Sequence, residues 1–295
     1  MRTYNPKQWF SILFQIHKPD TLRELAPLIG IIMGYTLIVA VIEIEVINAH
    51  EHSWFRNLNQ MHALVGLALS MLLVFRTNSA YDRWWEGRKL WGSLVNSSRN
   101  LAMKLDAMLP QEANAHRDFF CTTIPLFAHT LRQHLQDERT RFALDDAEHP
   151  ELANLNDQKH PPNQVAGSII HRCHNMRRDG DLSEMQLLFL EPQLSDFTNI
   201  TGACERIKNT PIPFSYSAFI KKFIFIYTIT LPFSFTGLLG YLVIPVVAFV
   251  FYVLASLELI AEEIEDPFGT DANDLPMDRI ATNIGKHVAE ILRLE

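Results

Sequence analysis

Charge is missing from one long stretch of this sequence. No Asp, Glu, Lys, Arg or His occurs among the 35 residues from Phe223 to Leu257. A membrane-spanning helix needs about 20 apolar residues, so this stretch exceeds one crossing. It is interrupted by Pro232, Gly237, Gly240 and Pro245. Because these residues favour a bend or a return, we expect a hairpin of two spans at about 215–236 and 240–261.

Cysteine is scarce, with 3 in 295 residues. The cysteines are Cys121, Cys173 and Cys204. They are widely spaced, in a segment that we expect in the reducing cytoplasm. This spacing and compartment predict neither disulfide bonds nor a thiolate metal cage.

Adjacent histidines are absent, although two spaced pairs occur: His129 with His134, and His171 with His174. Imidazoles suit iron, so a membrane-bound di-iron oxygenase is an alternative function. Such an enzyme needs several histidine clusters, including adjacent histidines. His129 and His134 also fall on opposite sides of a helix. We therefore expect no enzyme.

Two weaker apolar segments lie near the N-terminus, at 27–42 and 61–75. Glu43 and Glu45 follow the first one. An ionised Glu is tolerated near the end of a span but not at its centre, so the first span should finish there. We expect spans at about 27–45 and 58–76, which need tilt or protein neighbours to reach across the bilayer.

Basic residues favour one side of these spans. Four precede the first span, one lies between the first two, and four directly follow the second. They are Arg2, Lys7, Lys18 and Arg23, then Arg56, then Arg76, Arg83, Arg88 and Lys89. The positive-inside rule then predicts that both termini lie in the cytoplasm. We expect a multi-pass protein of the plasma (inner) membrane.

The second span continues as a helix beyond the membrane. Little between Met61 and Leu109 would break it, and Pro110 supplies a stop. Arg76 would mark the inner face of the membrane. We expect an all-α protein with four transmembrane helices and a helical cytoplasmic half at about 77–213 and 262–295.

Leu67, Met71 and Phe75 recur at every fourth position of the second span. We call these three residues the neck stripe. On one helical face, such a stripe could line a narrow apolar passage, or it could face lipid or the protein core. Periodicity alone does not separate these cases.

Three segments carry a family resemblance: FRTNSAYDRWWEGRKLWGSLVNSSRNLA at 75–102, GACERIKNTPIPFSYSAF at 202–219 and LIAEEIEDPFGTDANDLP at 259–276. In this order, and with these membrane segments, they resemble the bestrophin family of ion channels, in particular its bacterial branch. The resemblance runs over most of the chain, which we take as a single bestrophin-type domain, 1–295.

The resemblance implies a homopentamer with one axial pore that conducts small inorganic ions passively. The positions that match the family's hydrophobic pore neck are Leu67, Met71 and Phe75, and Met185 matches a second, cytoplasmic constriction. The expected partners are further copies of the chain, membrane lipid and small ions, with no nucleic acid and no required cofactor. A membrane scaffold that does not conduct is another alternative.

In animal bestrophins the segment matching DPFGTDAND forms a calcium clasp, whose acidic positions correspond here to Asp266, Asp271 and Asp274. Oxygen donors on a turn suit calcium. The segment is less acidic here, so calcium is not the favoured expectation. The favoured one is helix capping, together with pairing of glutamates with Arg76 or Arg83. The glutamates, on one helical face, are Glu258, Glu262 and Glu265.

Ion selectivity stays open. The family resemblance favours chloride or another anion. An apolar constriction carries no charge and therefore favours neither anions nor cations. Glu43, Glu45 and Glu51 lie near the expected outer mouth, where carboxylates facing the pore would concentrate cations such as sodium. They could equally be solvated rim residues.

Overall fold

The computed structural model describes residues 21–46, 53–110, 112–136 and 160–293. These residues form helices and turns, with no strand among them. The all-α class predicted from the sequence is confirmed. The chain separates into two compact units, each built from segments distant in sequence.

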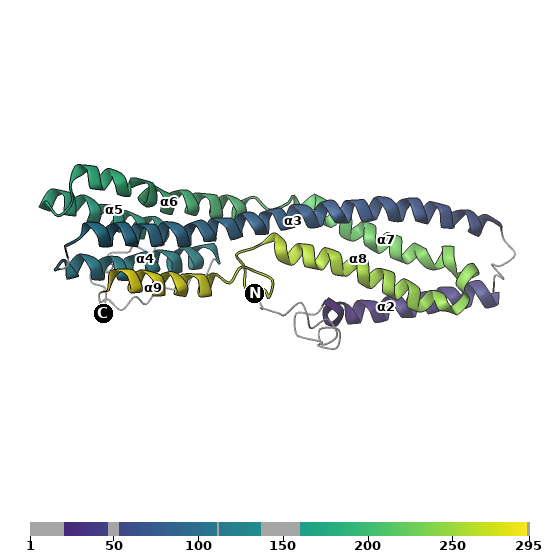
Figure 1. Cartoon of the computed structure of the whole chain (residues 1–295). Helices are drawn as coiled ribbons and strands as arrows, with labels where there is room; N and C mark the ends of the chain where they lie inside the picture. Colours follow the sequence, from purple (N-terminus) through teal and green to yellow (C-terminus); the bar gives the residue numbers. More distant parts are fainter. Residues whose placement is uncertain (1–20, 47–52, 111, 137–159, 294–295) are drawn as a thin grey trace. The chain divides into compact units, whose positions relative to one another are not determined.

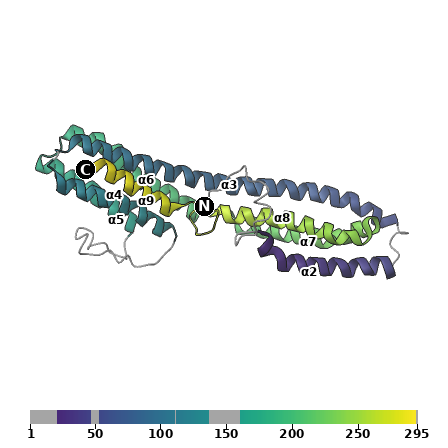
Figure 2. The same cartoon turned by 60° about the horizontal axis from the view of Figure 1, so that its bottom comes forward.

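The membrane unit comprises Arg2–Arg83 and Pro211–Asp266. Its elements are α2 (Thr21–Val41), the π-helical turn η1 (Ile42–Val46), the first part of α3 (Ser53–Met108), α7 (Phe214–Leu239), the 3₁₀ turn η3 (Gly240–Leu242) and α8 (Val243–Glu265). Helix α8 packs against both α2 and α7, as Figures 1 and 2 show. Aliphatic side chains from α2, α3, α7 and α8 form its core, including Ile32, Leu69, Ile224 and Val247.

Among the described residues, three stretches are long and apolar enough to cross a membrane, judged by length and composition. They are Thr21–Val46, Asn59–Met108 and Phe214–Glu265. The third stretch contains α7 and α8, which pack together as a hairpin. Gly240 has φ 56° at the turn, a conformation that glycine adopts without steric penalty. The hairpin predicted from the glycines and prolines is therefore present.

The bundle unit comprises Trp84–Thr210 and Pro267–Glu295. Besides the second part of α3, its elements are α4 (Asn114–Leu135), α5 (Pro161–Asp179), α6 (Glu184–Asn209) and α9 (Met277–Leu292). Helix α4 packs against α5, α6 and α9. Large aromatic side chains fill the core, where the rings of Phe127 and Phe197 meet edge to face at 4.7 Å. All three cysteines are buried here as free thiols.

Helix α3 ends at Met108, just before Pro110. The long helix predicted from the sequence is confirmed, although it begins at Ser53, earlier than predicted. Another sharp boundary separates α5 from α6, where Gly180 adopts φ 90°. Ser183 and Gln186 then form a capping box that starts α6 by satisfying two backbone N–H groups.

Candidate pore helix and its buried charges

The neck stripe lies on an exposed face of α3. Leu67, Met71 and Phe75 are 70%, 60% and 54% exposed in the single chain. The opposite face of the helix is buried through Leu69 and Leu73. The core of the membrane unit therefore does not use the stripe, which leaves lipid, another subunit or a water path to cover it.

Two further apolar residues extend this face, and the sequence reasoning missed them. Leu64 and Val74 are 67% and 58% exposed. They lie three residues from Leu67 and Met71, so they share a face with the stripe. Helical spacing could have found them, but their exposure could not be read from the sequence.

Polar contacts with α7 fix the orientation of α3. The two ring nitrogens of His62 lie 2.9 Å from Thr230 Oγ1 and 2.7 Å from Ser234 Oγ. A Cβ added at Gly66 would come within 2.7 Å of the Tyr227 hydroxyl, so the small residue permits this close approach. These contacts hold one face of α3 against α7 and leave the stripe on the other.

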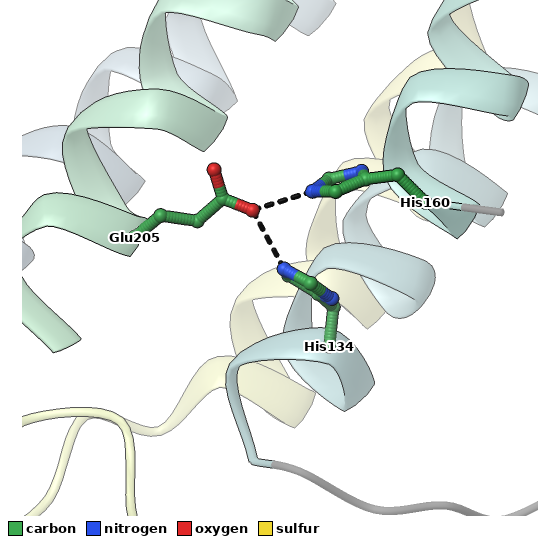
Figure 3. Close-up of side chains that lie close together, drawn as sticks. All are labelled: His134, His160 and Glu205. Atoms are coloured by element: carbon green, nitrogen blue, oxygen red, sulfur yellow. Dashed lines mark hydrogen bonds and ion pairs between the residues drawn. The ribbon is translucent and has the colours of Figure 1, made fainter. Parts of the chain in front are cut away.

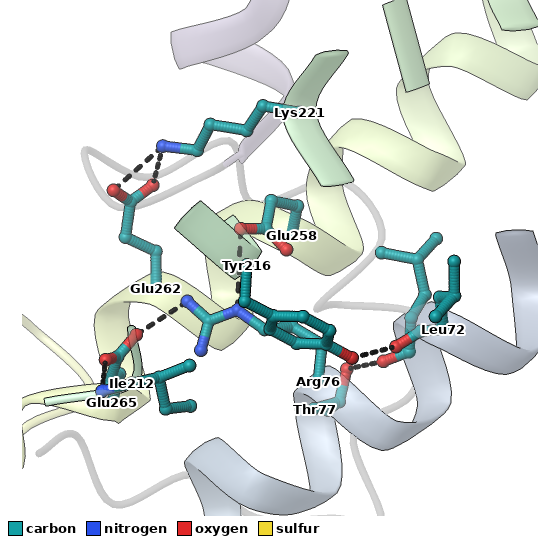
Figure 4. A network of polar contacts seen from close by, with 10 residues as sticks. Leu72, Arg76, Thr77, Ile212, Tyr216, Lys221, Glu258, Glu262 and Glu265 are labelled. Atoms are coloured by element: carbon teal, nitrogen blue, oxygen red, sulfur yellow. Dashed lines mark hydrogen bonds and ion pairs between the residues drawn. The ribbon is translucent and has the colours of Figure 1, made fainter. Parts of the chain in front are cut away.

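Directly after the stripe, the fully buried Arg76 joins α3 to α8 (Figure 4). Its Nη2 lies 2.6 Å from Glu265 Oε2, and its Nε lies 3.5 Å from Glu258 Oε1. Glu265 Oε1 also accepts the backbone N–H of Ile212 at 2.8 Å. One arginine thus binds two carboxylates, and one of these carboxylates also holds the segment that precedes α7.

The predicted pairing with an arginine is confirmed for Glu258 and Glu265, which pair with Arg76. It is wrong for Glu262, which pairs with Lys221 instead, whose Nζ lies 2.7 Å from Oε2. Arg83 contributes differently, since its Nε donates to the backbone carbonyl of Glu265 at 3.0 Å.

Met185, the predicted second constriction, lies in the first turn of α6 and is 74% exposed. Leu188 and Phe189 are also exposed, three and four residues further along on the same face. The capping box fixes the start of the helix. The result is an apolar patch, of which the sequence reasoning identified only Met185.

The three aspartates of the clasp-like segment differ in their surroundings. Asp266 is exposed at the end of α8. Asp271 is exposed, whereas Asp274 is buried and its Oδ2 accepts the backbone N–H of Asp271 at 2.6 Å. The carboxylate of Asp274 therefore helps to close the turn between them.

The acidic residues expected at the outer mouth also differ. Glu43 is buried in η1. Glu45 is exposed and accepts a hydrogen bond from the Tyr241 hydroxyl at 3.1 Å. Glu51 lies outside the described residues. The carboxylate of Glu43 is thus not part of a solvated rim in the single chain.

The histidine pairs weighed for an iron site are not brought together. His134 instead meets His160 and Glu205, and no group of three metal-ligating side chains in the described ranges contains His129, His171 or His174. Burial lowers the pKa of His129. Burial alone would raise the pKa of Glu205, but hydrogen bonds from His160 and His134 lower it overall.

Comparison with known proteins identifies the family. A model of bacterial and fungal bestrophins matches residues 1–290. This chain is a bestrophin. Among the relatives of this bestrophin, a protein of Nostoc sp. is 35% identical over 77% of this chain and 76% of its own length. YneE of Escherichia coli K12 is 34% identical over 75% and 73%. Both are named voltage-dependent anion channel-forming proteins.

Solved structures agree with this assignment. A crystal structure of a bacterial bestrophin homologue from Klebsiella pneumoniae has a TM-score of 0.76 and 26% identity, covering 91% of this chain and 98% of that chain. The resemblance drawn from the three sequence segments is confirmed.

Proposed function

We propose that this bestrophin is a homopentameric channel that conducts small inorganic anions passively across the membrane. The observation that carries the proposal is the exposed neck stripe on α3, in a chain whose family and relatives point to channels rather than enzymes. The relatives' names supply the sign of the ion.

The ring follows from the position of the stripe. One face of one helix cannot enclose a water path, so several copies of α3 must surround a shared axis. Identical chains that repeat one head-to-tail contact close into a ring when the rotation permits. Five copies are the number that the resemblance implies.

Gating then resides in the stripe itself. A ring of apolar side chains closes a pore by dewetting, and it conducts when it widens enough to stay hydrated. Leu67, Met71 and Phe75 supply three such rings at successive helical turns. The exposed patch at Met185 is proposed as a second, cytoplasmic constriction.

The proposed topology has four spans in the inner membrane and both termini in the cytoplasm. Support comes from the three apolar stretches, the third of which folds as the α7–α8 hairpin. The four basic residues directly after the second span support a cytoplasmic position for its C-terminal end under the positive-inside rule.

Conduction is proposed to need no calcium. The buried Asp274 carboxylate already accepts the Asp271 N–H, so one of the three oxygen donors is engaged in the turn. Unchanged currents in EGTA would agree with this proposal, and currents that appear only with calcium would contradict it.

Reversal potentials in asymmetric NaCl across a planar bilayer test the ion, with the subunit number measured by native mass spectrometry. Anion conduction shifts the potential toward the chloride equilibrium value. A shift toward the sodium value would make the channel cation-conducting, the alternative that the sequence left open. Pentamers without current would indicate a scaffold, and monomers would contradict the ring.

A further inference from the structure

His134, His160 and Glu205 converge from three helices of the bundle unit (Figure 3). His134 lies in the last turn of α4, His160 is the N-cap residue of α5, and Glu205 lies near the C-terminal end of α6. Pro161 and Pro162 follow His160 and begin α5, where proline favours helix initiation. Local sequence thus positions each residue, while the bundle brings the three together.

The ligand atoms of the three side chains meet at one point. Glu205 Oε1 lies 2.7 Å from His134 Nε2 and 2.5 Å from His160 Nε2. The imidazole rings are 4.4 Å apart between centroids. The three side chains are 28% to 31% exposed, so an ion could reach them from water while most of each side chain stays held by the protein.

This donor set matches the chemistry of zinc. Two imidazole nitrogens and one carboxylate oxygen with an open fourth position form a common zinc arrangement. Calcium and magnesium prefer oxygen ligands alone. With bonds of about 2.0–2.1 Å, tetrahedral ligands lie about 3.3 Å apart, so each of the two nitrogens needs to move away from Glu205 Oε1 by less than about 1 Å.

Two local contacts disfavour the binding of a metal ion at these side chains. His160 Nδ1 accepts the backbone N–H of Asn163 at 3.3 Å, which places the proton of the neutral ring on Nε2. A metal at Nε2 of the neutral ring requires the proton to move to Nδ1, which can then no longer accept this N–H, so binding costs this cap, already long for a hydrogen bond. Lys208 Nζ also lies 3.4 Å from the His134 carbonyl oxygen and adds positive charge nearby.

We propose that His134, His160 and Glu205 bind one divalent transition-metal ion of the zinc type, which fastens the end of α4 to the start of α5 and to α6. This metal site is separate from the proposed ion conduction, and its test does not depend on current.

The test uses the full chain in detergent, stripped with EDTA and titrated with ZnCl₂ by calorimetry. His134→Gln, His160→Gln and Glu205→Gln each remove one ligand. His116→Gln is the matched control, since His116 Nε2 contacts Asp181 Oδ2 at 3.1 Å in the same unit. We expect wild type and control to bind one more zinc per chain than the three variants. Alternatively, the variants' affinity at this site falls by about tenfold or more, at least the loss seen for outer-shell partners of metal ligands.

Equal stoichiometry and affinity in wild type and all three variants would overturn the proposal, because zinc would then bind elsewhere. Excess CaCl₂ should not displace the zinc, and displacement would contradict the donor chemistry.

If the variants lose their native elution profile in size-exclusion chromatography, the wild-type protein alone tests the proposal. Zinc should protect His134 and His160 from diethylpyrocarbonate, read residue by residue in the mass spectrometer, while the exposed His171 stays reactive. Modification of His134 and His160 at the same rate with and without zinc would contradict the site.

Discussion

Arg76 Nη2 lies 2.6 Å from Glu265 Oε2, and the arginine side chain is fully buried. Removing one partner of a buried ion pair leaves an uncompensated charge, which destabilises by about 3–5 kcal/mol. The pair therefore couples the helix that carries the neck stripe to α8, and the loss of either partner destabilises the protein.

Arg76→Met leaves the carboxylates of Glu258 and Glu265 without their arginine. We expect the melting temperature of the detergent-solubilised protein to fall by about 10 °C, from about 3–5 kcal/mol at about 2–4 °C per kcal/mol. Lys221→Met is the matched control. Its pair with Glu262 is half exposed and is worth about 1 kcal/mol or less. Equal losses in the two variants would contradict the importance of burial.

Shortening the neck stripe should open the pore. In a Leu67→Ala, Met71→Ala, Phe75→Ala variant, we expect single-channel conductance to rise severalfold, because a wider and less apolar neck stays hydrated. Ile38→Ala on α2, also a strongly exposed aliphatic residue, should leave conductance unchanged. Wild-type conductance in an intact triple variant would remove the stripe from the pore.

Gly87 permits a close contact that alanine would crowd. Its added Cβ would lie 3.2 Å from the Phe268 ring and from Pro267, and overpacking costs about 1–3 kcal/mol. The gain in helix propensity is about 1 kcal/mol, so Gly87→Ala should lower stability by about 1 kcal/mol in net terms. Gly202→Ala is the control, because a Cβ there meets no atom within 4 Å, and it should stabilise slightly. A Gly87→Ala protein with raised thermal stability would show that the contact relaxes freely.

The buried cysteines should resist thiol reagents. Burial raises the pKa of Cys173 and Cys204 to about 12. At pH 8 only a fraction of about 10⁻⁴ of each thiol is therefore ionised to the thiolate, which is the reactive form. At any pH below the pKa, a higher pKa slows labelling. In that range, each rise of one pH unit speeds labelling about tenfold. Maleimide labelling at pH 8 should be minimal in the native protein and complete in denaturant. Rapid native labelling at either position would contradict the burial.

Much of the membrane unit could be predicted from the sequence because its signals are local. The uncharged run with its glycines and prolines gave the α7–α8 hairpin, and Pro110 marked the end of α3. The spacing of the glutamates on one helical face predicted pairing with Arg76 or Arg83, and Arg76 is the partner of two of them. Each inference needs only helical periodicity, side-chain charge or the backbone preferences of Gly and Pro.

The sequence by itself determined which segments are helical, which are apolar and which residues share a face. Only the tertiary structure decided which face stays uncovered, so it alone shows that the neck stripe is exposed while Leu69 and Leu73 are buried. It also decided that Glu205 meets His134 and His160, from which it is 71 and 45 residues away in sequence. Such meetings depend on how several helices pack at once, and no local pattern along the chain encodes them.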